Sequence, residues 1–515
     1  MNALSLTDDV VEFMALQLQK LPPQTQQVLQ LAACIGNCFD LTTLAIVSQH
    51  SPTDTATVLW KALQEGLILP TSQIYKFFQG VEQSQTEEIV NPSYRFLHDR
   101  VQQAAYFLIP EDQKQATHLE IARLLLSNTP DAELEANIFG IVNHWNSAIA
   151  LVTDPSEKTN LAQLNLIAGR KAKASIAHEP AFEYFNTGIT LVSGRHWQTQ
   201  PELMLALYEG AAEAAYLSGN VAQMEQLVSE IFAQNLNPID CVKAYDIQIQ
   251  AYASQSRFTE AIAIARTALK QFNIYIPEQA TADIAQALQE VAELLNGRTA
   301  IDLLDLPVMT AAKPLALMQL LSSVLPSVYI SAPSLFPVMV ANQVKLSIQA
   351  GNTGISAYSY SCYAILLSTI VEDLDAADEF GQLGLQIVAK LNARPIQPKA
   401  YFVVSAFIIH CKSHLCNSLP LYEEAFQVGL EVGDLEHTAY TVMQLCQCVY
   451  LIGKNLTTLV AETEPYVATL VLVLATSKIP CGASIATNSL LEASNFNAER
   501  IQTIPFCKPN LKNLG

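Results

Sequence analysis

Pairs of helices separated by short turns recur along most of this 515-residue chain, and they constrain its fold more than any other feature. In residues 168–188, 208–227 and 245–265, small and aromatic residues flank turns near positions 178, 219 and 256. Residues 357–387 and 422–451 follow a similar scheme. The turns are spaced somewhat wider than the tetratricopeptide period of about 34 residues. Because small residues let paired helices approach closely and stack, the pattern predicts a tetratricopeptide-like array of helical repeats.

Composition agrees with an all-α protein that has a large buried core. Half of the residues are hydrophobic and 15% are charged, and alternating strand patterns are scarce. A chain of this length exceeds one compact core, so two to four domains are expected.

The first 110 residues are organised differently. Apolar periodicity predicts helices over residues 7–20, 24–35, 41–48 and 53–65, the first of them capped by Thr7. Two short apolar strands are predicted at 67–70 and 93–97, on either side of a polar loop. This order is typical of a winged helix. The expected fold class is therefore all-α with an N-terminal winged-helix domain. The expected divisions are a winged helix at 1–110, repeats at 111–470 and an irregular tail at 471–515.

Charge and cysteine usage bound the partners and the compartment. The net charge is −20, from 28 basic and 48 acidic residues, which opposes binding to nucleic acid. Ten cysteines occur without a C-x-x-C pair, as is typical of core residues in a reducing cytoplasm. No signal peptide is recognisable. The uncharged stretch 314–344 is interrupted by prolines, so buried helices joined at a turn are expected there rather than a membrane span.

Catalytic motifs are absent from the sequence. There is no phosphate-binding G-x-x-x-x-G-K-[ST] loop, and Gly453-Lys454-Asn455 lacks its upstream glycine and hydroxyl residue. The Gly-rich loop, H-R-D and D-F-G of protein kinases are also missing, and no histidines pair at a metal-ligand spacing. We therefore expect no enzyme activity, no metal and no cofactor bound by this chain alone.

One short segment is a candidate functional site. His98 and Asp99 lie where the second predicted strand meets a predicted helix over 98–109. Free N–H groups and the positive end of the helix dipole make such a position a natural anion site. The alternative is that Asp99 merely caps the helix and His98 is a partly exposed polar residue.

Two aromatic groups are weaker candidates for a binding surface. They are His144 with Trp145, and Tyr358 with Tyr360 and Tyr363. Aromatic residues on helices more often belong to the core, which is the expectation for both.

The sequence resembles a known family in four stretches. Residues 8–45, 94–114 (YRFLHDRVQQAAYFLIPEDQK), 161–189 and 357–385 are similar to large multi-domain signalling kinases found mainly in cyanobacteria. Those proteins join a serine/threonine kinase, an AAA-type ATPase of the STAND class, a long helical-repeat region, a GAF sensor and a histidine kinase. The resemblance covers about residues 5–470.

The resemblance implies a role for the candidate site. In STAND ATPases the winged helix packs on the nucleotide-binding core, and a Met-His-Asp or Leu-His-Asp motif there can bind the phosphate of ADP. Leu97-His98-Asp99 is similar in residues and in place. It implies that His98 senses nucleotide state with Asp99 as its cap, that ATP or ADP comes through an ATPase core absent from this chain, and that the repeats bind protein partners.

The chain also departs from the family. The kinase domain and ATPase core expected before residue 1 are missing, as are the GAF and histidine-kinase modules expected after the repeats. The last residues lose the helical period, so a truncated or split gene is expected. The main functional interpretation is a non-catalytic regulatory and scaffold segment of a signalling ATPase–kinase. The alternatives are a free-standing adaptor that binds peptides on its repeats, and a STAND-type transcription regulator, which the charge opposes.

Overall fold

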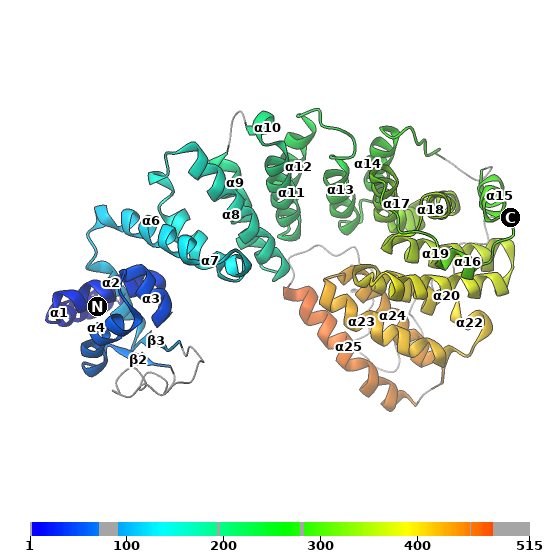
Figure 1. Ribbon diagram of the computed structural model, residues 1–515. Helices are drawn as coiled ribbons and strands as arrows, with labels where there is room; N and C mark the ends of the chain where they lie inside the picture. The colour runs from blue at the N-terminus through cyan, green and yellow to red at the C-terminus, as the bar shows by residue number, and fades with distance from the viewer. Residues whose placement is uncertain (1–2, 72–90, 193–195, 279–282, 454, 477–515) are drawn as a thin grey trace. The chain divides into compact units, whose positions relative to one another are not determined.

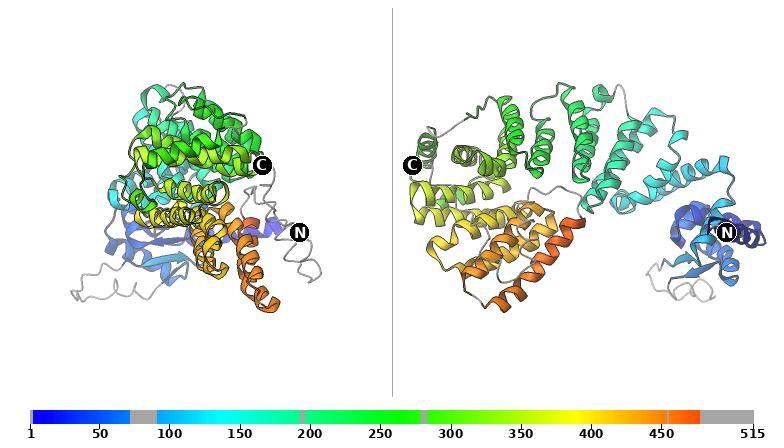
Figure 2. Two further views of the ribbon diagram at one scale, coloured as in Figure 1. Left: turned by 90° about the vertical axis from the view of Figure 1, so that its right-hand side faces the viewer. Right: turned by 180° about the vertical axis from the view of Figure 1, so that it is seen from behind.

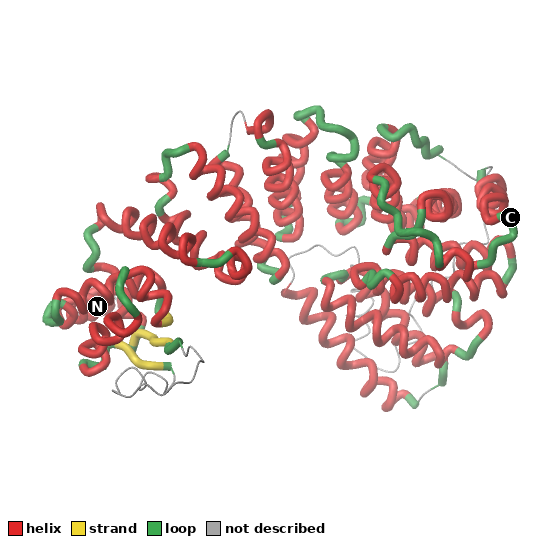
Figure 3. Tube along the Cα trace, in the orientation of Figure 1, coloured by secondary structure: helices red, strands yellow, loops and turns green. Residues whose placement is uncertain are grey.

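The computed structural model describes residues 3–71, 91–192, 196–278, 283–453 and 455–476 (Figure 1). The chain is mostly helical, as predicted (Figure 3). It divides into two compact units, Met1–Gly210 and Ala211–Gly515. The expected domain boundary at residue 110 stays a prediction.

The first unit begins with five helices and a small sheet. The helices and strands are α1 (Ala3–Leu18), α2 (Pro23–Ile35), β1 (Cys38–Asp40), α3 (Leu41–Ser48), α4 (Pro52–Gln64), β2 (Ile68–Pro70), β3 (Ser93–Phe96) and α5 (Asp99–Phe107). The four predicted helices and both predicted strands are confirmed within a few residues. α1 begins before Thr7, so the predicted start of this helix at Thr7 is wrong.

The sheet contains a third strand, β1, that the sequence did not predict. All pairs are antiparallel, and β3 lies in the centre, with Phe39 of β1 opposite Tyr94 and Leu69 of β2 opposite Arg95. Three residues are too few to show an alternating pattern, and the partner strand lies more than 50 residues away. The strand is therefore invisible to local sequence patterns.

Local chemistry explains where these helices start. The Asp40 carboxylate caps α3, accepting hydrogen bonds from Thr43 N at 2.8 Å and Thr43 Oγ1 at 2.6 Å. Ser51 caps α4 in the same way, and Pro52 occupies its first position. Fully buried side chains from three helices and two strands pack in one core: Leu29, Leu44, Leu59, Ile68 and Phe96.

The rest of the first unit consists of paired helices. They are α6 (Glu111–Asn128), α7 (Asp131–Ser147), the short 3₁₀ turn η2 (Ile149–Leu151), α8 (Pro155–Ala174), α9 (His178–Leu191), α10 (His196–Thr199) and the first part of α11 (Pro201–Leu217). α6 packs on α7, α7 on α8, and α8 on α9.

The predicted role of small residues in this packing is confirmed at Phe185. A Cβ atom added at Gly169 of α8 or at Gly210 of α11 would lie 2.5 Å or 2.7 Å from the Phe185 ring. The ring of α9 is thus held between two helices that approach closely because both carry glycine.

The described residues of the second unit lie mainly in helices, and the last three of these helices, drawn in orange shades, stand side by side (Figure 2). Its α-helices are α12 (Val221–Phe232), α13 (Val242–Ser254), α14 (Phe258–Lys270), α15 (Ile284–Leu295), α16 (Ala300–Leu304), α17 (Ala312–Ser331), α18 (Phe336–Ala350), α19 (Gly354–Leu366), α20 (Leu374–Lys390), α21 (Gln397–Phe407), α22 (Ile409–Lys412), α23 (Leu419–Val432), α24 (Leu435–Leu451) and α25 (Leu456–Thr476). The shorter segments are the 3₁₀ helices η3 (Pro333–Leu335), η5 (Arg394–Ile396) and η6 (Leu415–Ser418) and the π-helix η4 (Leu367–Val371).

The predicted hairpins are confirmed at α13–α14, α19–α20 and α23–α24. Packing in the middle of this unit departs from a regular stack of hairpins. α17 packs on both α13 and α14, α15 packs on α18, and α16 packs on α20. The helical array is therefore irregular between α14 and α20.

The uncharged stretch forms α17 and α18, joined at η3, which confirms the expected proline-marked turn. By length and composition, two of the described helical segments could cross a membrane: Ala312–Ser331 and Gly354–Val371. In the first segment 56% of the apolar 18-residue window is buried inside the protein, and in the second 61%. Core helices of soluble proteins are often as long and as apolar as these two segments.

The first residues of the predicted irregular tail are helical. α25 continues to Thr476, so residues 471–476 are helical. The remainder of the predicted tail, 477–515, lies outside the described residues.

Candidate functional site

The candidate site lies at the connection between β3 and α5. Leu97 N donates a hydrogen bond to Leu67 O at 2.9 Å, which keeps the chain attached to the β2 side as β3 ends. The Leu97 side chain is nevertheless 50% exposed. His98 has extended backbone angles, and α5 begins at Asp99.

The cap of α5 is His98 and not Asp99, which corrects the capping role predicted for Asp99. His98 Nδ1 accepts a hydrogen bond from Arg100 N at 3.2 Å. Asp99 is the first helical residue, and its carboxylate lies near the positive end of the helix dipole. Because Nδ1 accepts, the proton of the neutral ring is on Nε2, which is left as a hydrogen-bond donor. Both side chains are exposed.

The buried side of α5 holds this exposed start in place. Val101, Ala104 and Ala105 are buried, and α5 packs on α1 and α2. Gln102 Nε2 also donates to Ala33 O of α2 at 3.1 Å. The site is thus a fixed helix N-terminus that presents an imidazole N–H donor and an apolar side chain to the surface.

A second surface feature was not predicted from the sequence. An open groove of ≈ 560 Å³ follows one stripe of α6 and reaches η2. Its lining residues are Ala116, Leu119, Glu120, Arg123, Leu124, Ser127 and Leu151. All of them except Leu151 share a helical spacing on α6, but they mix small, apolar and charged types, so no sequence motif marks them.

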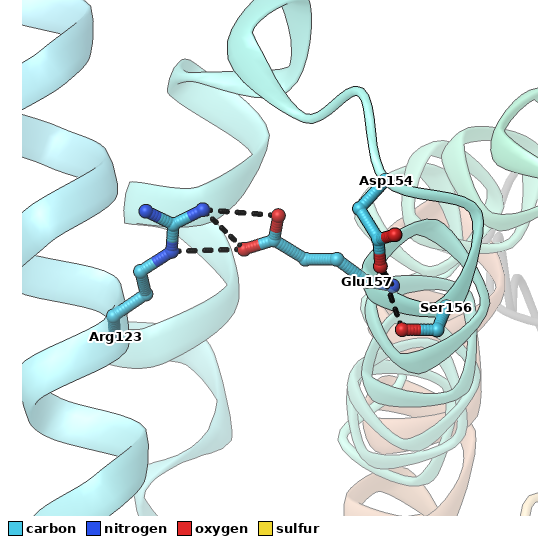
Figure 4. Close-up of polar contacts among 4 residues, drawn as sticks. All are labelled: Arg123, Asp154, Ser156 and Glu157. Atoms are coloured by element: carbon cyan, nitrogen blue, oxygen red, sulfur yellow. Dashed lines mark hydrogen bonds and ion pairs between the residues drawn. The ribbon is translucent and has the colours of Figure 1, made fainter.

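An ion pair lies beside this groove and joins α6 to α8 (Figure 4). Arg123 Nε donates to Glu157 Oε1 at 2.9 Å, and Nη2 donates to Oε2 at 3.0 Å. Asp154 caps α8, accepting from Ser156 Oγ at 2.6 Å and from Glu157 N at 2.9 Å. These hydrogen bonds, that of Ser156 first, lower the pKa of Asp154. The cap fixes the start of α8 and thereby the position of Glu157.

Arg123→Ala is expected to lower the free energy of unfolding by about 0.5–1 kcal/mol, because the pair is bidentate but half exposed on the arginine side. Urea denaturation of Arg123→Ala, Glu157→Ala and the double variant measures the coupling energy between the two side chains. Additive effects of the two substitutions would contradict this prediction.

The aromatic candidates belong to the core, as predicted. Trp145, Tyr358, Tyr360 and Tyr363 are all buried. The Tyr360 hydroxyl donates to Asn352 Oδ1 at 2.9 Å inside the second unit.

Comparisons with known proteins find one related signalling protein. No protein-family model matches the chain. The hybrid signal transduction histidine kinase G of Dictyostelium discoideum is 24% identical over 516 residues, which cover 87% of this chain and 15% of that protein. A solved structure of a STAND (signal transduction ATPase with numerous domains) protein with a tetratricopeptide repeat sensor, from Pyrococcus horikoshii, superposes with a TM-score of 0.40 at 11% identity, over 94% of this chain and 62% of that one. The chain is thus distantly homologous to a hybrid histidine kinase and spans a small part of its length.

Proposed function

We propose that this chain is a non-catalytic regulatory and scaffold segment of a cytoplasmic signal-transduction ATPase–kinase. In this proposal residues 1–110 are a winged-helix region, and the repeats bind protein partners. ATP or ADP reaches the segment through an ATPase core outside this chain. The observation that carries the proposal is the exposed start of α5. The side chains of Leu97, His98 and Asp99 lie on the surface there and do not pack into the protein's core.

The order of elements supports the winged-helix assignment. A helix (α2), a strand (β1), two helices (α3 and α4) and two further strands (β2 and β3) follow one another, and the last strand lies in the centre of the sheet. In this proposal the segment between β2 and β3 would be the wing. Most of it, 72–90, lies outside the described residues.

The chemistry of the α5 start suits a phosphate. The first N–H groups of a helix and its dipole attract an anion, and His98 Nε2–H supplies a donor of defined orientation because Nδ1 is used by the cap. In the ADP-bound state this donor would hold the segment on the core. Exchange to ATP would shift the population toward a released segment that engages partners.

His98→Leu is expected to accelerate ADP dissociation at least tenfold when this chain is assembled with its ATPase core. A hydrogen bond to a charged group contributes about 1.5–3 kcal/mol, which corresponds to roughly a 10- to 150-fold change in affinity. Release of a fluorescent ADP analogue by stopped flow measures the rate. Sequencing the DNA on both sides of this reading frame identifies the core to be used.

His414→Leu is the matched control. His414 caps η6 through the same geometry, with its Nδ1 accepting from Cys416 N at 3.2 Å, but it lies in the other unit. An unchanged ADP release rate in His98→Leu, or an equal change in His414→Leu, would contradict the sensor role. Flanking DNA without an ATPase core would remove support for the segment interpretation.

The groove along α6 favours one alternative, a free-standing adaptor that binds a peptide there. An adaptor of this kind would bind its peptide without any ATPase core, and Leu124→Glu in the groove would abolish binding. If binding instead requires the core, the adaptor interpretation is wrong.

A further inference from the structure

Three polar side chains form a chain of hydrogen bonds that links three helices of the first unit. The Tyr106 hydroxyl of α5 lies 3.1 Å from His118 Nε2 of α6. His118 Nδ1 lies 2.8 Å from His144 Nδ1 of α7. His144 is 7% exposed, and His118 is partly buried. We call these three residues the histidine relay.

The relay lies where the end of α5 meets the start of α6 and the end of α7. His118 is in the second turn of α6 and His144 is in the last turn of α7, so the pair holds together the ends of this hairpin that are far from its loop. Tyr106 is in the last turn of α5, the helix that begins beside His98. The relay therefore connects the helix that carries the candidate site to the first hairpin of the repeats.

Other polar contacts across this joint are few among the described residues. Gln49 Nε2 at the end of α3 donates to Glu120 Oε1 of α6 at 3.0 Å, where both side chains are exposed. The Lys114 ammonium of α6 lies 4.9 Å from the centre of the Tyr106 ring. Of the polar contacts, the relay is the buried one, so its loss should affect the joint most.

Proton counting shows why the His118–His144 contact is sensitive to acid. Two facing Nδ1 atoms can bond only if one carries a proton and the other does not. With both rings neutral, one proton is shared between them, and the Tyr106 hydroxyl can donate to or accept from His118 Nε2. A first added proton keeps one Nδ1 atom as acceptor but places a charge in a dehydrated site. A second added proton protonates both Nδ1 atoms, so that two N–H groups and two positive charges face each other.

The surroundings offer little compensation for such a charge. Burial first, and the neighbouring His118 second, lower the pKa of His144 to about 4, and burial lowers the pKa of His118. Facing Tyr106 are Cys34 of α2 and Glu111 and Lys114 of α6.

We propose that the histidine relay is a proton-sensitive latch that fastens the α6–α7 hairpin to α5. When the latch is closed, it transmits movement of α5 to the repeats. When its histidines are protonated, the latch opens and α5 is no longer coupled to the repeats. The transmission of a nucleotide signal rests on the function proposed above, whereas the latch itself does not. An open joint takes up protons below pH 6.5, where the closed joint does not, so closure is lost as the pH falls from 6.5 toward about 4 and is unaffected above 6.5.

Hydrogen–deuterium exchange on the full chain tests the latch. After correction for intrinsic rates, protection of residues 111–147 is expected to fall about tenfold between pH 7.5 and pH 5. His144→Asn keeps a hydrogen-bonding group near the Nδ1 position but cannot take up a proton, so its protection should change less than twofold. His50→Asn, at an exposed position in the same unit, should respond to pH as the unmodified chain does.

Tyr106→Phe provides a second test that retains the ring and both histidines. It should reduce protection at the end of α5 and the start of α6 severalfold at pH 7.5. A pH-independent pattern in the unmodified chain, a full pH response in His144→Asn, or unchanged protection in Tyr106→Phe would overturn the latch. None of these measurements involves nucleotide. A failed latch therefore leaves the His98 experiment intact, and a failed His98 experiment leaves the latch intact.

Discussion

Gly384→Ala is expected to lower the free energy of unfolding by about 1–2 kcal/mol, although alanine is the better helix former. An added Cβ atom would overlap Ser361 Oγ and would lie 2.8 Å from Ala357 O, both on α19. The serine side chain can rotate but the backbone carbonyl cannot, so α20 would have to move away from α19. Overpacking of this kind costs about 1–3 kcal/mol and outweighs a propensity gain of about 1 kcal/mol.

Gly140→Ala is the matched control for this prediction. Gly140 lies inside α7, and an added Cβ atom there meets nothing within 4 Å. This substitution should raise the free energy of unfolding by about 0.5–1 kcal/mol. Urea denaturation followed by circular dichroism measures both. Stabilisation by Gly384→Ala would show that the two helices are not in the close contact described.

Asp246→Ala is expected to have a still larger effect, about 3–5 kcal/mol. Asp246 of α13 is 1% exposed. Its carboxylate accepts hydrogen bonds from Gln250 Nε2 at 2.8 Å, from Gln319 Nε2 at 3.0 Å and from Ser323 Oγ. Removal of the acceptor would leave the partly buried Gln319 and Ser323 of α17 without this partner, and each donor left unsatisfied costs about 1–3 kcal/mol.

Asp240→Ala, at an exposed position shortly before α13, should change the free energy of unfolding by less than about 0.5 kcal/mol. Asp246→Asn should fall between the two, because it keeps one acceptor oxygen. A change below about 1 kcal/mol in Asp246→Ala would mean that Gln319 and Ser323 find other partners or water.

Local sequence patterns predicted the helices of this protein well. α3 begins and ends as expected because Asp40 caps it and because its apolar positions are periodic. The hairpin at α23–α24 was found because Gly433, which adopts a positive φ of 75°, and Asp434, which caps the second helix, mark its turn. These signals act within a few residues and need no knowledge of the tertiary structure.

The relations between distant elements could not be predicted in the same way. β1 needs its distant partner β3 before it is a strand. The packing of α17 on α13 and α14 depends on side-chain shapes that no repeat period encodes.

The candidate site shows the same limit. The position of His98 at a helix start was predicted correctly, but the choice between His98 and Asp99 as cap depends on backbone angles. The contact between His118 and His144 joins residues 26 positions apart on two helices, so a search for closely spaced histidines could not find it.

α17 packs on the α13–α14 hairpin but is synthesised after it. This order has a consequence for folding on the ribosome. A regular repeat can fold on its predecessor as soon as it is complete. The α13–α14 hairpin ends at Lys270, but the surface that covers it and the partners of Asp246 lie on α17, which ends at Ser331. At about 5–20 residues per second, the hairpin waits for roughly 3–12 s with an apolar face and a carboxylate uncovered. During that interval the nascent chain offers a chaperone a binding surface that the finished protein conceals.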